Sequence, residues 1–221
     1  MKKFFMTIWD FIKQLFGCKC KCCENTCPNI GTVELNPEHL IATDKQDMYL
    51  NYSNNYRWYE TCLKLKDFLD QENDGSLEEV VNVFQAIVEE GNGFDTRVHK
   101  FQHFNDGQYM HDSISGFWVE DFPLNDEAIK LSFKEAYEKL MATNCPKPHS
   151  RYVTLRKQVG PVDCNPQYIF GNLKTQVYVD AVTGKVSETN PAFDKSYEDK
   201  DPKIKYAFNW LAERMPLGEW P

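Results

Sequence analysis

The sequence has no uninterrupted apolar run long enough to cross a membrane. A transmembrane helix needs about 20 mainly apolar residues, whereas charged and polar residues recur throughout these 221 residues. We therefore expect no transmembrane helix. A secretory signal peptide is also disfavoured, because Asp10, Lys13 and Gln14 interrupt the apolar residues near the N-terminus.

The sequence also lacks the motifs of common catalytic sites. Gly91-Asn92-Gly93 has neither the preceding strand nor the third glycine of a phosphate-binding loop. The glycine of Ser113-Ile114-Ser115-Gly116 is wrongly placed for a nucleophile elbow. Cys145 or Cys164 could pair with His149 as nucleophile and base, but the sequence gives no sign that they meet. These absences favour a non-enzymatic protein.

Positive charge is scarce. The chain has 25 Lys and Arg against 33 Asp and Glu, which gives a net charge of -8. Because nucleic-acid binding needs clustered basic side chains to neutralise phosphates, we expect no general nucleic-acid surface. Aromatic residues make up 14% of the chain, which suits protein contacts, where aromatic side chains act as anchors.

The first sixteen residues predict an amphipathic helix. At helical spacing, one half of the wheel is apolar and the other carries mostly lysine and polar residues. An apolar stripe this wide must be covered by the rest of the chain, by another protein or by a membrane surface. The apolar residues are Phe4, Phe5, Ile8, Trp9, Phe11, Ile12, Leu15 and Phe16.

Two kinds of partner therefore stay open for this segment. It docks on other protein subunits, or it holds the protein peripherally on a membrane, helped by acylated cysteines. Leu15-Phe16-Gly17-Cys18 resembles a bacterial lipoprotein cleavage box, but the bulky Phe16 and the amphipathic segment before it argue against export. At the other terminus, Trp220 is a second candidate anchor for docking.

A cysteine cluster follows the predicted helix and holds five of the eight cysteines. Closely spaced thiolates can bind a soft cation, so zinc is a possible cofactor, although the spacing differs from that of a zinc module with two separated ligand pairs. The alternative is a patch of cysteines that is exposed or contacts a partner protein. We therefore predict no cofactor, with zinc as the possible exception. The five are Cys18, Cys20, Cys22, Cys23 and Cys27.

Three histidines form a second candidate metal site. Residues 98–104 and 108–119 predict a β-hairpin with a turn at Asn105-Asp106-Gly107. Alternation puts His99 and His103 on one face, and a three-residue loop would place His111 beside them. Three imidazoles suffice for a metal or for catalysis, but a plain surface cluster is commoner.

Periodicity predicts an α+β fold, with a helical hairpin and further helices packed on a mainly antiparallel sheet. The hairpin spans residues 56–90, with a capping box that begins at Ser76, and other helices span 128–142 and 204–214. Further strands are expected at 152–159, 168–170 and 175–187. We expect an amphipathic helix and cysteine-rich segment over 1–30, an extended linker over 31–55 and one domain over 56–221.

The string from Val177 to Val186 is similar to the hairpin of PepSY-type domains, which implies only a local hairpin. In its acidic, aromatic composition and short terminal arms the chain resembles accessory proteins of tailed bacteriophages. We therefore predict a non-enzymatic interaction or assembly protein, such as a virion component, that docks through its terminal segments. It would be cytoplasmic or virion-associated rather than secreted. The alternatives are a peripheral membrane protein and a small metal-binding protein or metal-dependent enzyme.

Overall fold

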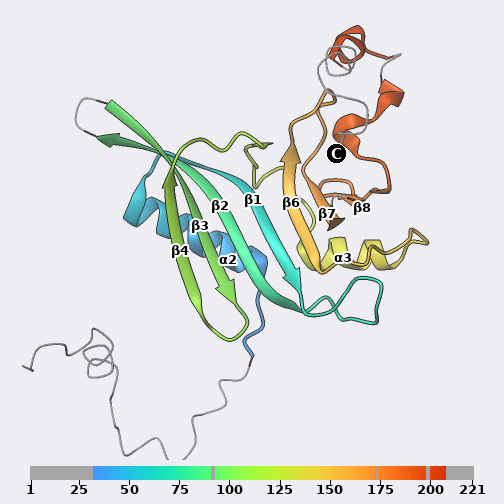
Figure 1. Cartoon of the computed structure of the whole chain (residues 1–221), viewed down its shortest axis with the longest axis horizontal. Coiled ribbons are helices and arrows are strands. Elements are labelled where there is room, and N and C mark those ends of the chain that lie inside the picture. Colours follow the sequence, from blue (N-terminus) through green and yellow to red (C-terminus); the bar gives the residue numbers. More distant parts are fainter. Residues whose placement is uncertain (1–31, 91–92, 173, 198–199, 208–221) are drawn as a thin grey trace, which may run out of the picture. The chain divides into compact units, whose positions relative to one another are not determined.

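The fold is built on one antiparallel sheet of nine strands (Figure 1). The computed structural model describes residues 32–90, 93–172, 174–197 and 200–207. The strands are β1 (Tyr56–Leu65), β2 (Leu77–Glu90), β3 (Gly93–Phe104), β4 (Tyr109–Ser115), β5 (Asp121–Phe122), β6 (Tyr152–Gln158), β7 (Gln167–Asn172), β8 (Thr175–Asp180) and β9 (Val186–Ser187). Their order in the sheet is β4-β3-β2-β1-β6-β7-β8-β9, and β5 pairs with the end of β6.

Two groups of sequential strands make up this sheet. In the first group β1 pairs with β2, β2 with β3 and β3 with β4, and in the second group β6 to β9 pair in the same sequential way. The pairing of β1 with β6 joins the groups and places Thr61 opposite Leu155. The connection from β4 to β5 carries the chain from the edge of the sheet back to β6.

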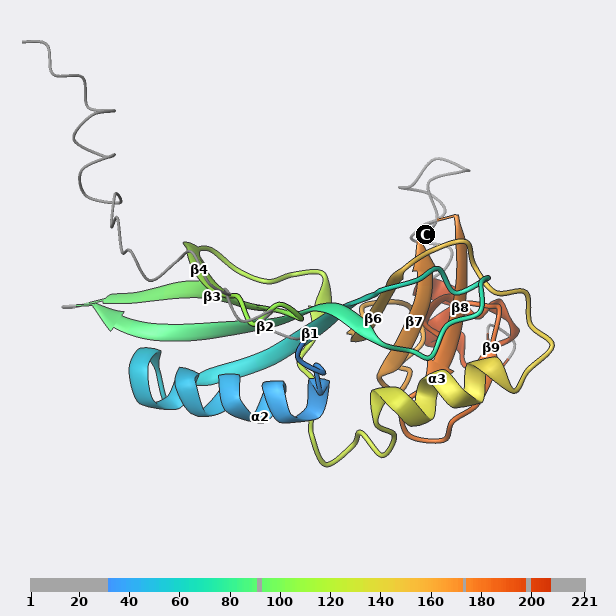
Figure 2. The same cartoon turned by 90° about the horizontal axis from the view of Figure 1, so that it is seen from below.

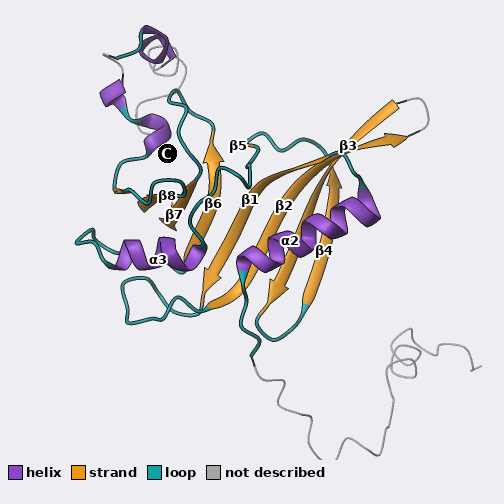
Figure 3. Ribbon diagram, turned by 180° about the vertical axis from the view of Figure 1, so that it is seen from behind, coloured by secondary structure: helices purple, strands orange, loops and turns teal. Residues whose placement is uncertain are grey.

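Two helices cover the same face of the sheet, which we call the inner face (Figures 2 and 3). Helix α2 (Pro37–Asp47) continues into the π-helical turn η1 (Met48–Tyr52) over the first group, and α3 (Phe133–Met141) lies under the second. Two short 3-10 turns, η2 (Pro191–Phe193) and η3 (Lys195–Tyr197), follow β9. None of the described helices is long and apolar enough to span a bilayer.

The core lies between these helices and the inner face. Its largest fully buried side chains include Phe84, Phe101 and Phe170 from three different strands. The ring of Phe84 packs edge-on against Phe101, with centroids 5.7 Å apart. Helix α2 contributes Ile41, and α3 contributes Leu140. The sheet thus supplies most of the buried surface.

The helical hairpin predicted for residues 56–90 is wrong, because these residues form β1 and β2. On β2, Val80, Phe84 and Ala86 face inward and Val83 outward, and all four are buried. Between Val80 and Ala86, each face also carries one polar residue, Asn82 inside and Gln85 outside. These polar residues interrupt the alternation and leave apolar residues three and four apart, which imitates a helix. The fold is therefore dominated by its sheet, with only a few short helices.

A bulge hides the strand period of β1. The register shifts between Trp58 and Glu60, so Trp58 and Thr61 both face inward although they lie three residues apart. Beyond the bulge, Leu63 and Leu65 continue the inner face. A single extra residue thus produces helix-like spacing in a strand. The predicted capping box at Ser76 is also wrong, because this residue directly precedes β2.

The extended linker predicted for residues 31–55 is corrected by α2 and η1. Asn36 caps α2 by accepting from the backbone N–H of His39 at 2.8 Å, and Pro37 occupies the first helical position. The helix has few apolar residues, and only Pro37, Ile41 and Asp44 are buried. The apolar periodicity is therefore too weak to reveal it, whereas the cap and the proline were readable signals.

The predicted hairpins and strands of the second half are confirmed. Strand β3 pairs with β4 across Asn105-Asp106-Gly107, where Gly107 has a φ of 83°. The PepSY-like string forms β8 and β9, with Tyr178 opposite Ser187. Strands β6 and β7 lie close to their predicted positions. Most of the helix predicted over 204–214 lies outside the described residues.

Helix α3 is shorter than predicted and begins after Ser132 rather than near residue 128. Ser132 accepts from the Glu135 N–H, and the Glu135 carboxylate accepts from the Ser132 N–H at 2.8 Å. Ser132→Ala is expected to lower the free energy of unfolding by about 1 kcal/mol, because it removes this capping box. Urea denaturation measures the change. The exposed Ser113 provides the control, and equal losses for both alanine variants would contradict the capping role.

Candidate functional site

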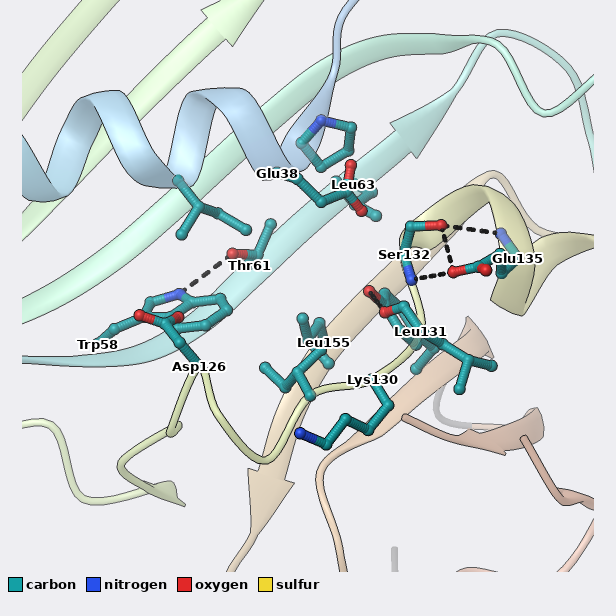
Figure 4. A pocket seen from close by; sticks show the side chains of 14 residues that line it. Glu38, Trp58, Thr61, Leu63, Asp126, Lys130, Leu131, Ser132, Glu135 and Leu155 are labelled. Atoms are coloured by element: carbon teal, nitrogen blue, oxygen red, sulfur yellow. Dashed lines mark hydrogen bonds between the residues drawn. The ribbon is translucent and has the colours of Figure 1, made fainter. Parts of the chain in front are cut away.

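A pocket of about 360 Å³ opens on the inner side of β1 (Figure 4). Helix α2, strand β1 and residues 126–132 form its walls, and β6 and β7 close it from below. Residues 126–132 lie here because α3 begins only at Phe133. The lining is mainly apolar, with Ile41, Trp58, Leu63, Ile129, Leu131 and Leu155.

Acidic side chains stand at opposite ends of this pocket (Figure 4). At one end, Glu38 Oε1 accepts from the Phe133 N–H at 2.7 Å, next to Glu135 Oε2, which accepts from Ser132. At the other end, Asp126 binds Lys45. The Lys45 ammonium also lies 4.1 Å from the ring centroid of Trp58, a cation–π contact.

A buried chain of hydrogen bonds leads from the pocket wall under α2. Trp58 Nε1 donates to Thr61 Oγ1 at 3.2 Å, and Thr61 donates to Asn82 Oδ1 at 2.6 Å. Asn82 Nδ2 then donates to Asp44 Oδ2 at 2.7 Å. His103 Nε2 lies 3.0 Å from both oxygens of Asp44. The buried carboxylate of Asp44 thus accepts directly from β2 and β3, and the bonds of β1 end on it through Asn82. These bonds fix α2 to the sheet.

The structure brings two of the three predicted histidines together. The hairpin loop has three residues, so His111 pairs with Phe101, and its Nε2 lies 3.1 Å from His99 Nδ1. The hydroxyl of Tyr52, at the end of η1, lies 3.2 Å from His111 Nδ1. His99 is 3% exposed, and its Nε2 has no partner within the described residues.

This geometry favours neutral imidazoles. A buried ring nitrogen without a proton costs less free energy than a buried N–H without an acceptor. We therefore assign the proton of His99 to Nδ1, which faces His111, and leave Nε2 unprotonated. Burial, followed by the neighbouring His111, lowers the pKa of His99 to about 4. Burial also lowers the pKa of His111. The pair therefore resists protonation near neutral pH.

His103 lies apart from this pair, because it binds Asp44. Within the described ranges, no group of three or more His, Cys, Asp and Glu side chains is placed to hold a metal ion. The predicted three-histidine centre is therefore not assembled in this structure. The predicted docking helix over 1–16, the cysteine cluster Cys18–Cys27 and Trp220 all lie outside the described residues.

A second buried polar cluster lies on the outer face of the sheet. Asp121 accepts from Trp118 Nε1 at 3.2 Å and lies 3.6 Å from Arg156 Nη1. Glu60 is the register partner of Arg156 across β1 and β6. Burial raises the pKa of Asp121 to about 6 and also raises that of Glu60. Two buried carboxyl groups thus compete for one arginine.

Strand β4 forms one edge of the described sheet and is almost wholly exposed. Met110 and Ile114, on its outer face, are each 57% exposed. Phe117 and Val119, in the connection that follows, are 72% and 77% exposed. The edge strand itself thus exposes Met110 and Ile114, whereas the connection with Phe117 and Val119 already turns back over the sheet, where the Trp118 N–H donates to Gln85 of β2.

Neither the pocket nor the chain of hydrogen bonds to Asp44 is predicted by the sequence. Asn82 was a readable signal, because a lone amide inside Val80-Val81-Asn82-Val83-Phe84 requires a buried partner. Its partner Asp44 gave no signal, since it lies in a segment without clear periodicity. The pocket residues come from four separate elements that only the fold brings together.

Comparison of the chain with models of protein families, with curated proteins and with solved structures found no match in any of the three.

Proposed function

We propose that this protein is a non-enzymatic interaction protein that binds an extended segment of another protein along the free edge of β4. The observation that carries the proposal is an exposed edge strand that combines open backbone groups with exposed apolar side chains. Such an edge is a template for an added strand. Docking through residues 1–16 and 216–221, and assembly into a virion, stay predictions of the sequence.

The sequence of β4 supports this use of its edge. Edge strands that avoid pairing usually carry lysine or proline, or bend away at a bulge. Strand β4 has neither residue, and its pairing with β3 is regular from Tyr109 to Ser115. Asp112 is its one acidic residue. This strand thus lacks the usual protection against strand addition.

The outer face of β4 defines the partner. Asp112 lies between Met110 and Ile114 on this face, because side chains alternate along a strand. On β3, Lys100 lies opposite Asp112. A matching partner strand places apolar side chains beside Met110 and Ile114 and a lysine or arginine beside Asp112. Two copies paired symmetrically about Asp112 would instead oppose two carboxylates, so the proposed partner is a different chain.

Selection from a library of random peptides on the full-length protein tests this proposal. We expect the bound peptides to alternate apolar and other residues, with a basic residue between two apolar ones. Ile114→Lys is expected to weaken their binding about tenfold, because it places a charge in the apolar contact. Asp112→Lys is expected to shift the preference at the central position toward Asp or Glu by about two- to fivefold.

Tyr152→Lys is the matched control, because Tyr152 is 56% exposed, close to the 57% of Ile114, but lies on β6. Peptides without alternation would contradict the proposal, as would equal binding to the Ile114→Lys and Tyr152→Lys variants. A selection that yields no binders would also count against it.

A further inference from the structure

We infer that the pocket beside β1 binds a small organic cation with an apolar body, whose ammonium or guanidinium group lies at Glu38 and Glu135. This inference concerns the inner face and is independent of the proposed strand addition at β4. The pocket volume of about 360 Å³ is at the lower end of the range for small-molecule sites. It therefore suits a body about the size of one aromatic ring with a short chain.

Both carboxylates bind the start of α3, and both side chains are exposed to solvent. Glu38 reaches across from α2 to the Phe133 N–H, and Glu135 folds back to the adjacent Ser132 N–H. Each uses one oxygen in these bonds, so its second oxygen stays available. Neither forms an ion pair within the described part of the chain, in contrast to Asp126, which binds Lys45.

The opposite end of the pocket already holds a cation that belongs to the chain. Lys45 lies over the ring of Trp58 and neutralises Asp126. A ligand cation therefore gains most at Glu38 and Glu135, while its apolar body packs on Leu63, Leu131 and Leu155. The second cationic side chain near the pocket, Lys130, lies on the far side from Glu38 in Figure 4. An anionic ligand of the same shape meets two carboxylates, although Lys139, one turn along α3, attracts that of Glu135.

Phenethylamine and phenylpropionate test this charge preference, because they share a phenyl ring and differ in the sign of their charge. We would titrate each into the full-length protein and follow the Trp58 indole N–H and the Leu155 amide in proton–nitrogen correlation spectra. Phenethylamine is expected to shift both signals and to bind at least about tenfold more tightly than phenylpropionate.

Glu38→Gln combined with Glu135→Gln removes both charges and keeps the acceptors that bond to α3. This variant is expected to lose the preference for phenethylamine, with binding weakened about tenfold. Glu127→Gln is the matched control, since Glu127 is exposed and does not line the pocket. A thermal melt verifies that both proteins fold.

Three results would overturn the inference. Phenylpropionate could bind as tightly as phenethylamine, the Glu38→Gln and Glu135→Gln double variant could bind phenethylamine as the Glu127→Gln protein does, or neither compound could shift the two signals. Each result removes a different support, namely the sign of the charge, the residues that carry it, or the pocket itself.

Discussion

Replacing Asp44 with alanine is expected to lower the free energy of unfolding by about 4 kcal/mol. Asp44 is 2% exposed and accepts from Asn82 and His103, so its removal leaves the buried Asn82 amide and the part-buried His103 ring without their acceptor. Loss of a buried polar partner costs more than the bond itself is worth, because the remaining groups stay desolvated. Chemical denaturation at neutral pH measures the change.

An apolar version of the same chain is the control for this prediction. Thr61→Val, Asn82→Leu and Asp44→Leu together remove the buried donors and acceptors of the chain except His103, whose side chain is 13% exposed and can turn to water. Trp58 Nε1 keeps its bond to the Glu60 carbonyl at 3.1 Å. We expect the triple variant to be more stable than Asp44→Ala alone. A triple variant that is less stable would show that the bonds themselves, rather than the cost of unpaired groups, hold α2 on the sheet.

Asp121→Asn is expected to raise the free energy of unfolding by up to about 3 kcal/mol near pH 8, with almost no change near pH 4. The pKa of Asp121 rises from 3.8 to about 6 because burial outweighs the attraction of Arg156. The folded protein therefore binds this proton more tightly than the unfolded chain. The associated stability is complete below pH 3.8 and is lost as the pH rises through 6.

The neutral asparagine fits the bonds that surround Asp121. Its oxygen keeps the bond from Trp118, and its amide can donate to Gln158, the register partner whose Oε1 has no partner within the described residues. Arg156 keeps Glu60 as a counter-charge. Asp67→Asn, at an exposed position after β1, is the control. If the free energy of unfolding near pH 8 rises no more for Asp121→Asn than for Asp67→Asn, the proposed cost of the buried charge is contradicted.

His99 has the opposite pH dependence. Its pKa falls from 6.5 to about 4 in the folded state, so stability is present above pH 6.5 and about 3 kcal/mol is lost as the pH falls through 4. Between pH 7 and 4 the two groups offset each other. Denaturation of both variants across this range should therefore show a steeper acid loss for Asp121→Asn and a shallower one for His99→Gln. If stability depended on pH in the same way in both variants, the opposite pH dependences of Asp121 and His99 would be disproved.

The sequence predicts those parts of the fold whose signal is local. The turn Asn105-Asp106-Gly107 sets the β3–β4 register, and with it the contact between His99 and His111. Prediction from the sequence fails where tertiary packing overrides the local pattern of apolar and polar residues. Strand β2 is buried on both faces, so Val83 and Phe84 are both apolar and a period of two cannot be read.

The candidate sites were harder to predict than the hairpins. Glu38 and Glu135 both bind the start of α3 because α2 and α3 begin close together in space, and no spacing in the chain records this. Asp121 resembles any other acidic residue until the sheet buries it beside Arg156. By contrast, the exposed apolar residues from Met110 to Val119 stand close together in the sequence, although their exposure needs the structure.

The single seam between β1 and β6 has a consequence for how the chain folds. The pairings within the two strand groups join strands that are neighbours along the chain. The pairing of β1 with β6 instead joins Thr61 to Leu155, which is far away in the sequence. Closing so long a loop is costly in entropy, so the seam is the slow step and each group forms first. While the ribosome is still making the second group, the edge of β1 that later pairs with β6 has no partner strand. Newly made chains are then most vulnerable to aggregation through Glu60–Lys64, and β4 is the edge that stays open afterwards.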